Sequence, residues 1–266
     1  MAARKTIFIT GGASGIGRAV ALKFAAEGWF VGLGDVDELG MTETQGLIAN
    51  GFTYAEKLDV RDRAAWDRVL ETFIIAAGGQ LNCLFNNAGI PLGGPLAECS
   101  TEEIDRCIDI NLRGVFYGAQ AAHPWLVKSA PDACLLNTAS AAGIYGTPGA
   151  SVYSATKFGV RALTESLDAE WFESGIKVRS LMPGFIDTPL LEHNPNARAN
   201  HSVRQSVTEG GLEITPVENV AEAAWAAVNG DRLHTTVGKT AKSLAFAARW
   251  MPGKLRKRVR GGRAMG

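Results

Sequence analysis

Short runs rich in β-branched and aromatic residues alternate with longer helical patterns along most of this 266-residue chain. This alternation constrains the fold more than any other feature, because strands that are joined by helices are parallel and need right-handed crossovers. The predicted strands lie in TIFIT, WFVGLGD, TYAEKLDV, LNCLFNNAG, ACLLNTAS, IKVRSLMPG and HTTVG. The predicted helices cover residues 16–27, 38–49, 63–77, 101–128, 153–173 and 217–228. We therefore predict an α/β fold with a doubly wound parallel β-sheet, flanked by helices on both faces, in a single domain.

Two segments of the chain depart from this alternation. Residues 189–215 are polar and rich in Asn and Gly, and a connection of that length is typical of a lid or a binding loop. From Lys239 onward the chain has nine Lys or Arg residues and no Asp or Glu. We therefore assign the folded domain to residues 1–238, with a substrate lid loop at 189–215, and a basic C-terminal extension to residues 239–266.

The composition excludes several classes of partner. The formal net charge is +0 at pH 7, so we expect no nucleic-acid partner. The four cysteines form no CxxC pair, and neither they nor the four histidines have metal-ligand spacing, so we expect no metal site. We interpret the cysteines as reduced thiols of a cytoplasmic protein. The opening residues MAARK run directly into TIFIT without the pattern of a signal peptide, which agrees with that location.

The segment TGGASGIG lies between the first predicted strand and the first predicted helix. Its glycines Gly11, Gly15 and Gly17 allow a sharp backbone turn and the close approach of a ligand. The helix that follows presents free N–H groups and a partial positive charge to a phosphate. A glycine-rich stretch alone indicates little more than a turn, but this one follows the first strand of a series of βαβ units. It therefore predicts a Rossmann-type dinucleotide-binding domain, with Ser14 and Ile16 also among the cofactor-binding residues.

Asp35 ends the second predicted strand, about 24 residues after Gly11, where this fingerprint expects an acid that binds the ribose. A carboxylate accepts hydrogen bonds from both ribose hydroxyls and repels a 2′-phosphate. No Lys or Arg precedes Gly15 in the loop, and Arg18, which opens the helix, is expected to face away. We therefore predict NAD as the cofactor, with NADP as the less favoured alternative. Asp37 is the better candidate to cap the next helix.

Seven short motifs occur in a fixed order along the chain. They are TGGASGIG, LDV, NNAG, INLRG, TASAAG, YSATK and MPGFIDTP. In order and spacing, over roughly residues 5–228, they resemble the compact short-chain dehydrogenase/reductase family. The resemblance implies that the domain 1–238 is both dinucleotide-binding and catalytic. It also implies a homotetramer or homodimer in which the helices at 101–128 and 153–173 form a shared bundle.

The resemblance further implies where the cofactor is bound. Asp59 and the Val60 backbone would lie near the adenine, and NNAG would bring Asn87, Ala88 and Gly89 near the ribose. The PGFIDT segment would cover the nicotinamide. Its cofactor-binding residues would be Pro183, Gly184, Ile186 and Thr188.

Asn111, Ser140, Tyr153 and Lys157 match the catalytic tetrad of the family. The motif YSATK places Tyr153 and Lys157 on one helix face, one turn apart. A phenol near its free pKa of about 10 is a poor base at neutral pH, but a neighbouring ammonium favours the phenolate. We therefore interpret Tyr153 as a general acid/base. The resemblance implies that Ser140 holds the substrate oxygen, that Tyr153 and Lys157 also contact the cofactor, and that Asn111 orders a water linking Lys157 to solvent.

The expected substrate pocket is mainly apolar, which favours an apolar substrate. Its predicted residues are Ile144, Tyr145, Phe185, Leu190 and Leu191. The lid also contains two arginines and two histidines, Arg198, Arg204, His193 and His201. These four could meet a polar group of the substrate, but their interpretation as ordinary solvated loop residues is favoured.

Apolar residues recur at helical spacing in the basic extension, from Leu244 to Val259, and the pattern is interrupted at Pro252. An amphipathic helix on an anionic membrane surface is one interpretation. A solvated tail, or apolar residues that pack on the domain or on a neighbouring subunit, are the favoured alternatives.

These features predict an NAD-dependent oxidoreductase that transfers a hydride between the nicotinamide and a secondary alcohol or ketone. NADP-dependent carbonyl reduction at the same site is the first alternative. The second is a non-catalytic dinucleotide-binding regulatory protein, which the presence of all four tetrad residues disfavours.

Overall fold

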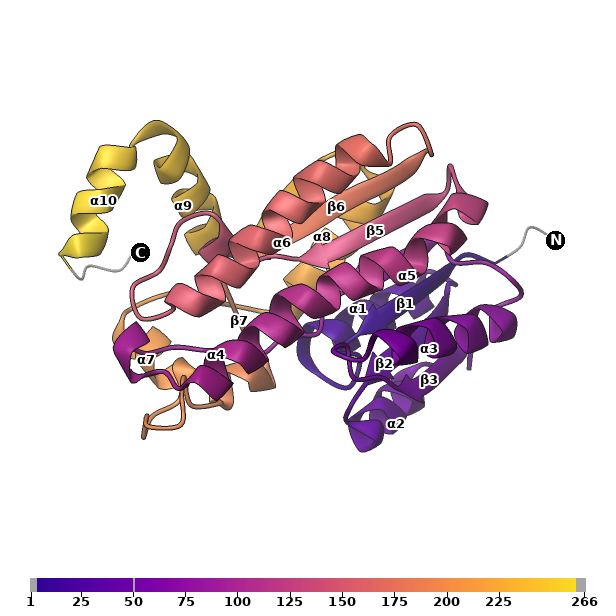
Figure 1. The fold of residues 1–266 in the computed structure, drawn as a ribbon, viewed down its shortest axis with the longest axis horizontal. Helices are drawn as coiled ribbons and strands as arrows, with labels where there is room; N and C mark the ends of the chain where they lie inside the picture. The colour runs from indigo at the N-terminus through magenta and orange to yellow at the C-terminus, as the bar shows by residue number, and fades with distance from the viewer. Residues whose placement is uncertain (1–3, 50, 262–266) are drawn as a thin grey trace.

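The computed structural model describes residues 4–49 and 51–261, and a seven-stranded sheet runs through the middle of the molecule (Figure 1). Its strands are β1 Thr6–Thr10, β2 Phe30–Asp35, β3 Thr53–Lys57, β4 Cys83–Asn86, β5 Ala133–Thr138, β6 Ile176–Pro183 and β9 His234–Val237. Their order across the sheet is β3-β2-β1-β4-β5-β6-β9, and every neighbouring pair is parallel. The predicted doubly wound parallel sheet is confirmed.

Each helix predicted from the sequence is present, with small shifts at its ends. The helices are α1 Gly15–Ala26, α2 Glu38–Leu47, α3 Arg63–Ala76, α4 Thr101–Ile108, α5 Gly114–Ser129, α6 Ser151–Glu170 and α8 Val217–Asn229. A π-helical turn, Asp109–Arg113, divides the predicted helix at 101–128 into α4 and α5. Asp37 accepts a hydrogen bond from the Gly40 amide, so its predicted role as the cap of α2 is confirmed.

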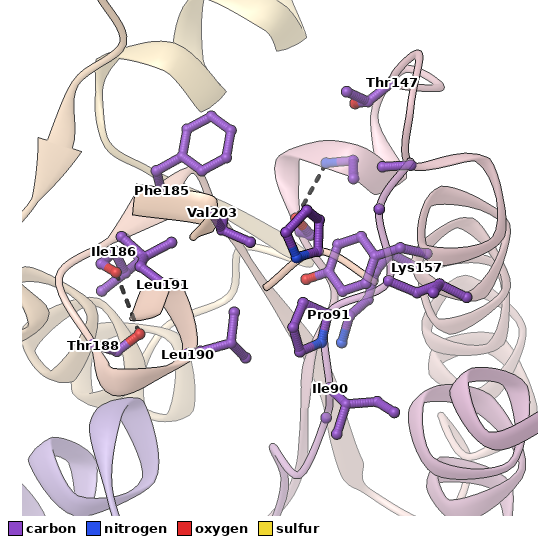
Figure 2. Close-up of a pocket in the computed structure, with 18 of the residues that line it drawn as sticks. Ile90, Pro91, Thr147, Lys157, Phe185, Ile186, Thr188, Leu190, Leu191 and Val203 are labelled. Atoms are coloured by element: carbon purple, nitrogen blue, oxygen red, sulfur yellow. Dashed lines mark hydrogen bonds between the residues drawn. The ribbon is translucent and has the colours of Figure 1, made fainter. Parts of the chain in front are cut away.

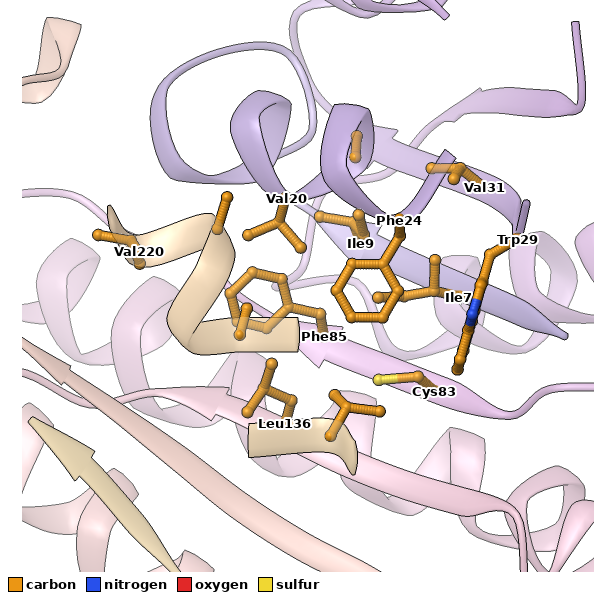
Figure 3. Packing of buried hydrophobic residues seen from close by; sticks show 14 of the residues in the cluster. Ile7, Ile9, Val20, Phe24, Trp29, Val31, Cys83, Phe85, Leu136 and Val220 are labelled. Carbon is orange, nitrogen blue, oxygen red and sulfur yellow. The ribbon is translucent and has the colours of Figure 1, made fainter. Parts of the chain in front are cut away.

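Helices cover both faces of the sheet because each face is apolar. On one face, α1 and α8 pack on the central strands through buried residues that include Phe24, Phe85 and Val220 (Figure 3). On the other face, α3, α5 and α6 pack on the sheet through a second core that contains Trp66 and Phe73. Strands covered in this way are buried throughout, as the patterns of β1, β4 and β5 show.

The order of the strands positions the site. β1 pairs with β2 on one side and with β4 on the other. The strands from β1 to β3 therefore extend the sheet in one direction, and the strands from β4 onward extend it in the other. In open α/β sheets, ligands bind outside the carboxyl ends of the strands at such a switch point. The residues that end the strands here are Thr10 on β1, Asp35 on β2, Asn86 on β4 and Thr138 on β5.

Two segments contain more regular structure than the sequence predicts. The lid at 189–215, expected as a loop, contains a 3₁₀ turn at Pro189–Glu192, helix α7 at Val203–Glu209 and strand β8 at Ile214–Thr215. β8 pairs with β7, Phe185–Ile186, immediately before the lid. Because this pairing and α7 depend on contacts made by the folded domain, local composition gives no indication of them.

The C-terminal extension forms two helices, α9 Lys239–Trp250 and α10 Pro252–Arg260. They stand as a hairpin at one end of the molecule, beyond the edge of the sheet (Figure 1). The break between them falls at Pro252, as the interrupted spacing predicts. Among the described residues, no helix is both long and apolar enough to span a lipid bilayer.

The close packing of β2 gives a test of the fold. A Cβ added to Gly32 would lie 2.5 Å from ring atoms of Phe73 and 2.6 Å from the Phe8 ring. We expect Gly32→Ala to lower the free energy of unfolding by about 1–3 kcal/mol, because the core would be overpacked. Gly46, in helix α2, has open space around it, so Gly46→Ala should instead raise stability by about 0.5–1 kcal/mol. Urea unfolding of both variants checks the pair, and equal effects would contradict this account of the core.

Candidate active site

A cavity of about 1180 Å³ opens at the carboxyl ends of the strands. It exceeds the roughly 300–1,000 Å³ of typical small-molecule pockets, so it has space for more than one small ligand. Most of the residues predicted from the sequence line it. They are Gly11, Ser14, Gly15, Ile16, Asp35, Asp59, Val60, Asn87, Ala88, Gly89, Ser140, Tyr145, Tyr153, Lys157, Pro183, Gly184, Phe185, Ile186, Thr188, Leu190 and Leu191.

Three predicted residues do not line the cavity. Gly17 is buried beneath the glycine loop, where an added Cβ would lie 2.0 Å from the Gly11 carbonyl oxygen. Asn111 is fully buried behind the wall. Ile144, predicted as a pocket residue, packs instead against the small apolar cluster that contains Val160 and Met182. This contact removes apolar surface of Ile144 from water, which the cavity wall would not do as fully.

The glycine loop brings the N-terminus of α1 to the cavity. Gly11 and Gly15 have φ values of 68° and 52°, a region that favours glycine. Ser14 is the N-cap residue of α1, but its side chain accepts no hydrogen bond from the helix. The first amides of the helix therefore remain available to an external acceptor, and they carry the positive end of the helix dipole. This cradle fits the phosphates of a dinucleotide.

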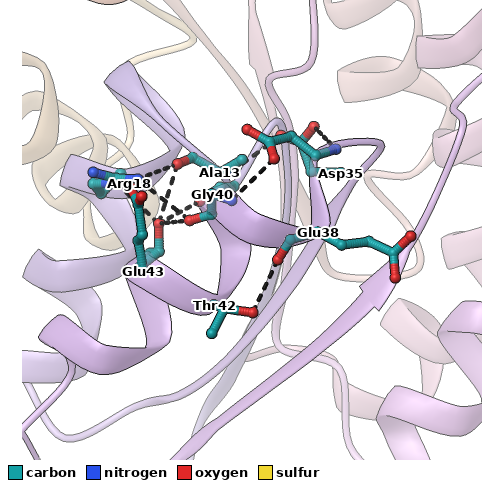
Figure 4. A network of polar contacts seen from close by, with 10 residues as sticks. Ala13, Arg18, Asp35, Glu38, Gly40, Thr42 and Glu43 are labelled. Carbon is teal, nitrogen blue, oxygen red and sulfur yellow. Dashed lines mark hydrogen bonds and ion pairs between the residues drawn. The ribbon is translucent and has the colours of Figure 1, made fainter.

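Asp35 is fixed beside this loop by two backbone amides. Its Oδ2 accepts from the Ala13 N–H at 3.1 Å, and its Oδ1 accepts from the Asp37 N–H at 3.1 Å (Figure 4). Arg18 lies in the same network but does not line the cavity. Its guanidinium donates to the Ala13 carbonyl at 2.6 Å and to Glu43 at 2.9 Å. A negative carboxylate therefore borders the cavity, while the nearest cation of the loop is already paired.

The NNAG turn is held against the glycine loop by Thr10. The Thr10 hydroxyl accepts from the Asn87 and Ala88 amides at 3.0 and 3.1 Å. The Asn87 side chain donates to the Thr10 carbonyl at 3.0 Å. Asp59 also lines the cavity and forms an ion pair with Arg61. The hydrogen bond from Arg61 lowers the pKa of the Asp59 carboxyl.

Lys157 and Tyr153 come from the same face of α6, where Lys157 is buried and Tyr153 is half-buried. The Lys157 Nζ donates to the Thr138 carbonyl at 2.9 Å and lies 5.6 Å from the centre of the Tyr153 ring. Burial disfavours charge, so it lowers the pKa of Lys157 to about 8 and raises the pKa of Tyr153 to about 12. A hydrogen bond with Ser140 acts on the Tyr153 pKa in the opposite direction. Ser140 itself, at the end of β5, accepts from the Ala142 amide at 3.1 Å.

Asn111 lies behind these groups in the π-helical turn. Its Oδ1 accepts from the Ile90 N–H and its Nδ2 donates to the Ile90 carbonyl, each at 2.8 Å. A Cβ added to Gly89 would lie 3.2 Å from the Asn111 Oδ1 and 3.6 Å from the Lys157 Nζ. Gly89 therefore leaves space between the amide and the ammonium. Sequence reasoning found Asn111 but missed Cys107, whose buried sulfur accepts from Asn111 and whose pKa burial raises to about 11.

Apolar side chains from opposite walls face each other in the outer part of the cavity. Phe185, Leu190, Leu191 and Val203 lie on one side and Ile90 and Pro91 on the other, the latter beside Lys157 (Figure 2). Of the four basic or imidazole residues singled out in the lid, Arg198 and His201 line the cavity and His193 and Arg204 do not. Arg204 instead pairs with Asp187 and Glu192.

The C-terminal hairpin also contributes to the wall, which sequence reasoning missed. Leu244 of α9 and Val259 of α10 line the cavity. Their helical spacing is visible in the sequence, but spacing identifies a face and not the surface on which that face packs. The described residues contain no group of His, Cys, Asp or Glu side chains arranged to hold a metal ion.

Comparison with known proteins agrees with this geometry. A sequence model described as short chain dehydrogenase matches residues 5–199. The 3-oxoacyl-[acyl-carrier-protein] reductase FabG of Thermotoga maritima is 37% identical over 195 residues, which are 72% of this chain and 78% of that protein. Levodione reductase of Leifsonia aquatica is 33% identical over 227 residues, 82% of this chain and 83% of that protein.

A solved structure gives the same result in three dimensions. A short-chain dehydrogenase/reductase from Burkholderia phymatum, in complex with NAD, matches with a TM-score of 0.83 at 27% identity. The match covers 96% of this chain and 95% of that one. With the fold, the glycine loop and the family match in agreement, the chain belongs to the short-chain dehydrogenase/reductase family of oxidoreductases.

Proposed function

We propose that this protein is an NAD-dependent oxidoreductase that transfers a hydride between the nicotinamide and a secondary alcohol or ketone. The observation that carries the proposal is the position of Tyr153, on the cavity wall between Ser140 and the enclosed ammonium of Lys157. The wall that contains the glycine loop and Asp35 fits a dinucleotide, whose nicotinamide, when bound, supplies the hydride donor or acceptor.

Tyr153 is the proton carrier in this proposal. In the oxidation direction its phenolate oxygen takes the proton of the substrate hydroxyl, and in the reduction direction its phenol returns that proton to the carbonyl oxygen. A phenol with a pKa near 12 is protonated at neutral pH, so alcohol oxidation needs a further group that favours its anion. Lys157 is charged below its pKa of about 8, and in this proposal its ammonium, 5.6 Å from the centre of the Tyr153 ring, favours the phenolate.

Ser140 and Asn111 support this transfer in different ways. The Ser140 hydroxyl, which is hydrogen-bonded with Tyr153, is placed to hold the substrate oxygen beside the phenol. Asn111 acts as a positioning residue. Its amide, held by the Ile90 backbone, faces Lys157 across Gly89, where a water could connect the ammonium to solvent.

Asp35 supports NAD over NADP. Its carboxylate is held at the cavity wall by two amides, and a 2′-phosphate there would meet a fixed negative charge. The apolar outer cavity supports an apolar substrate. The Thermotoga and Leifsonia relatives are named for different substrates, a 3-oxoacyl-[acyl-carrier-protein] and levodione, so the relatives favour the reaction type more than one compound.

Exposed aromatic residues support the homo-oligomer that the resemblance implies. Phe116 on α5 and Phe158 on α6 are 46% and 40% exposed. These are the two helices expected to form a shared bundle, and pairing two copies through them would cover both rings.

The first test removes the proton carrier. Tyr153→Phe keeps the ring and deletes only the hydroxyl, so we expect the turnover number to fall by about 10²–10⁴-fold. NAD binding, measured by fluorescence titration, should change much less. Tyr117→Phe is the matched control, because Tyr117 does not line the cavity, and it should leave the rate unchanged. A Tyr153→Phe variant that keeps the wild-type rate would refute the proposed role.

The second test uses the dependence of the rate on pH. Carbonyl reduction needs the protonated phenol and should decline as pH rises through the Tyr153 pKa, whereas alcohol oxidation needs the phenolate and should increase. Lys157→Met removes a cation that favours the phenolate, so both transitions should move to higher pH. Lys177→Met, outside the cavity, is the control. Profiles of kcat/KM against pH measure the shift, and a shift to lower pH would contradict this electrostatic account.

The third test concerns the cofactor. Asp35→Ala should lower the NAD-to-NADP ratio of kcat/KM by at least about tenfold, because the hydrogen bonds to the ribose are lost and the repulsion of a 2′-phosphate is removed. Asp37→Ala deletes an equal charge two residues later and should cost about 1 kcal/mol of stability without changing that ratio. A wild-type enzyme that prefers NADP would contradict the assignment of Asp35.

A further inference from the structure

The outer face of α9 exposes large apolar side chains. Phe246 is 59% exposed and Trp250 is 64% exposed, and their spacing of four residues places them together on one side of the helix. Met251, at the turn into α10, is 37% exposed. Large apolar residues grouped on one face of a soluble protein are typical of an interaction surface.

The inner face of the same hairpin is already used. Ala241 and Ala247 of α9 are buried against the domain, and Leu255 of α10 is 2% exposed. Leu244 and Val259 line the cavity. The apolar residues of the hairpin therefore divide into an inner set that packs on the domain and an outer set that does not, so the exposed rings are not required to fold it.

The charged residues of the C-terminal extension are all basic. Residues 239–266 contain nine of the 27 Lys and Arg residues of the chain and none of its 27 Asp and Glu residues. On α9, Lys242 lies one turn before Phe246, and the Arg249 guanidinium lies 5.1 Å from the centre of the Trp250 ring. The exposed basic residues of α10 are Lys254, Arg256, Lys257, Arg258 and Arg260. The outer face therefore combines aromatic rings with a surrounding positive field.

We propose that the α9–α10 hairpin binds the surface of an anionic phospholipid membrane, with Phe246 and Trp250 inserted between the headgroups. Aromatic rings at the level of the headgroups, flanked by Lys and Arg that meet lipid phosphates, are the features by which amphipathic helices bind such surfaces. The hairpin lies at one end of the molecule with its outer face away from the sheet, so a flat surface can reach it (Figure 1).

The continuity of the hairpin with the cavity gives this binding a consequence. Because Leu244 and Val259 form part of the cavity wall, a membrane against the outer face of α9 lies close to the end of the cavity that they border. An apolar substrate dissolved in the lipid would then have a short path to Tyr153. This consequence rests on the proposed function, whereas the binding itself does not.

Sedimentation of the full chain with vesicles tests the binding. We expect the protein to sediment with phosphatidylcholine vesicles that contain phosphatidylserine, and to be released as the salt concentration is raised. The double variant Phe246→Ser, Trp250→Ser should lower the bound fraction at least about tenfold, since it removes the rings that are buried in the lipid. Phe172→Ser, which changes a 75% exposed ring next to α6, is the matched control and should bind as the wild type does.

Two results would overturn the proposal. One is a wild type that does not sediment with anionic vesicles, and the other is a double variant that sediments as the wild type does. If the surface instead joins two copies of the chain, the wild type will not sediment, and the mass measured by light scattering will be lower for the double variant than for the wild type. NAD reduction with a water-soluble secondary alcohol, assayed without vesicles, should be equal in wild type and double variant. Failure of the proposed function is therefore seen separately from failure of the binding.

Discussion

The hydrogen bond from the Lys157 ammonium to the Thr138 carbonyl is the interaction on which the rest of the site depends. Thr138 ends β5, and the next residues lead to Ser140, while Lys157 lies one turn after Tyr153 on α6. This bond joins α6 to the end of β5, alongside the apolar packing of α6 on the sheet, and it lies beside the phenol and the Ser140 hydroxyl. A buried ammonium without a hydrogen-bond partner is energetically costly. The Thr138 carbonyl provides that partner and lowers the cost of burying the Lys157 charge.

Burial acts on the two titrating groups in opposite directions. It lowers the pKa of Lys157 toward neutrality and raises that of Tyr153 away from it. A phenol with this pKa stays protonated at neutral pH, whereas the pKa of Lys157 lies close to neutrality. The Lys157 Nζ lies 5.6 Å from the centre of the Tyr153 ring, so the two groups are neighbours on one helix face. In the proposed mechanism the two residues act together, because a cation beside a buried phenol favours its phenolate.

Sequence reasoning recovered the half of the site that local chain geometry determines. The glycine loop, Asp35 at the end of β2 and the Tyr153–Lys157 pair follow from the order of strands and from helical spacing, so their positions could be predicted. The remainder depends on contacts between distant segments. Ile144 faces a cluster of its own, Asn111 bonds to the Ile90 backbone rather than lining the cavity, and α7 forms where composition indicates a loop. No local pattern encodes which surface a side chain will meet.

The two ends of the cavity also differ in whether local turns or contacts between distant segments build them. The dinucleotide end is built from turns between buried parallel strands, cross-linked by bonds such as those of Thr10 with the NNAG turn. The outer end is built from the lid and the C-terminal hairpin, and the β7–β8 pairing beside the lid forms a two-stranded sheet separate from the central one. Loops and terminal segments can change without disturbing the sheet, whereas the turns between strands cannot. The outer wall, the proposed substrate end of the cavity, can therefore change in sequence more freely than the turns that build the dinucleotide end.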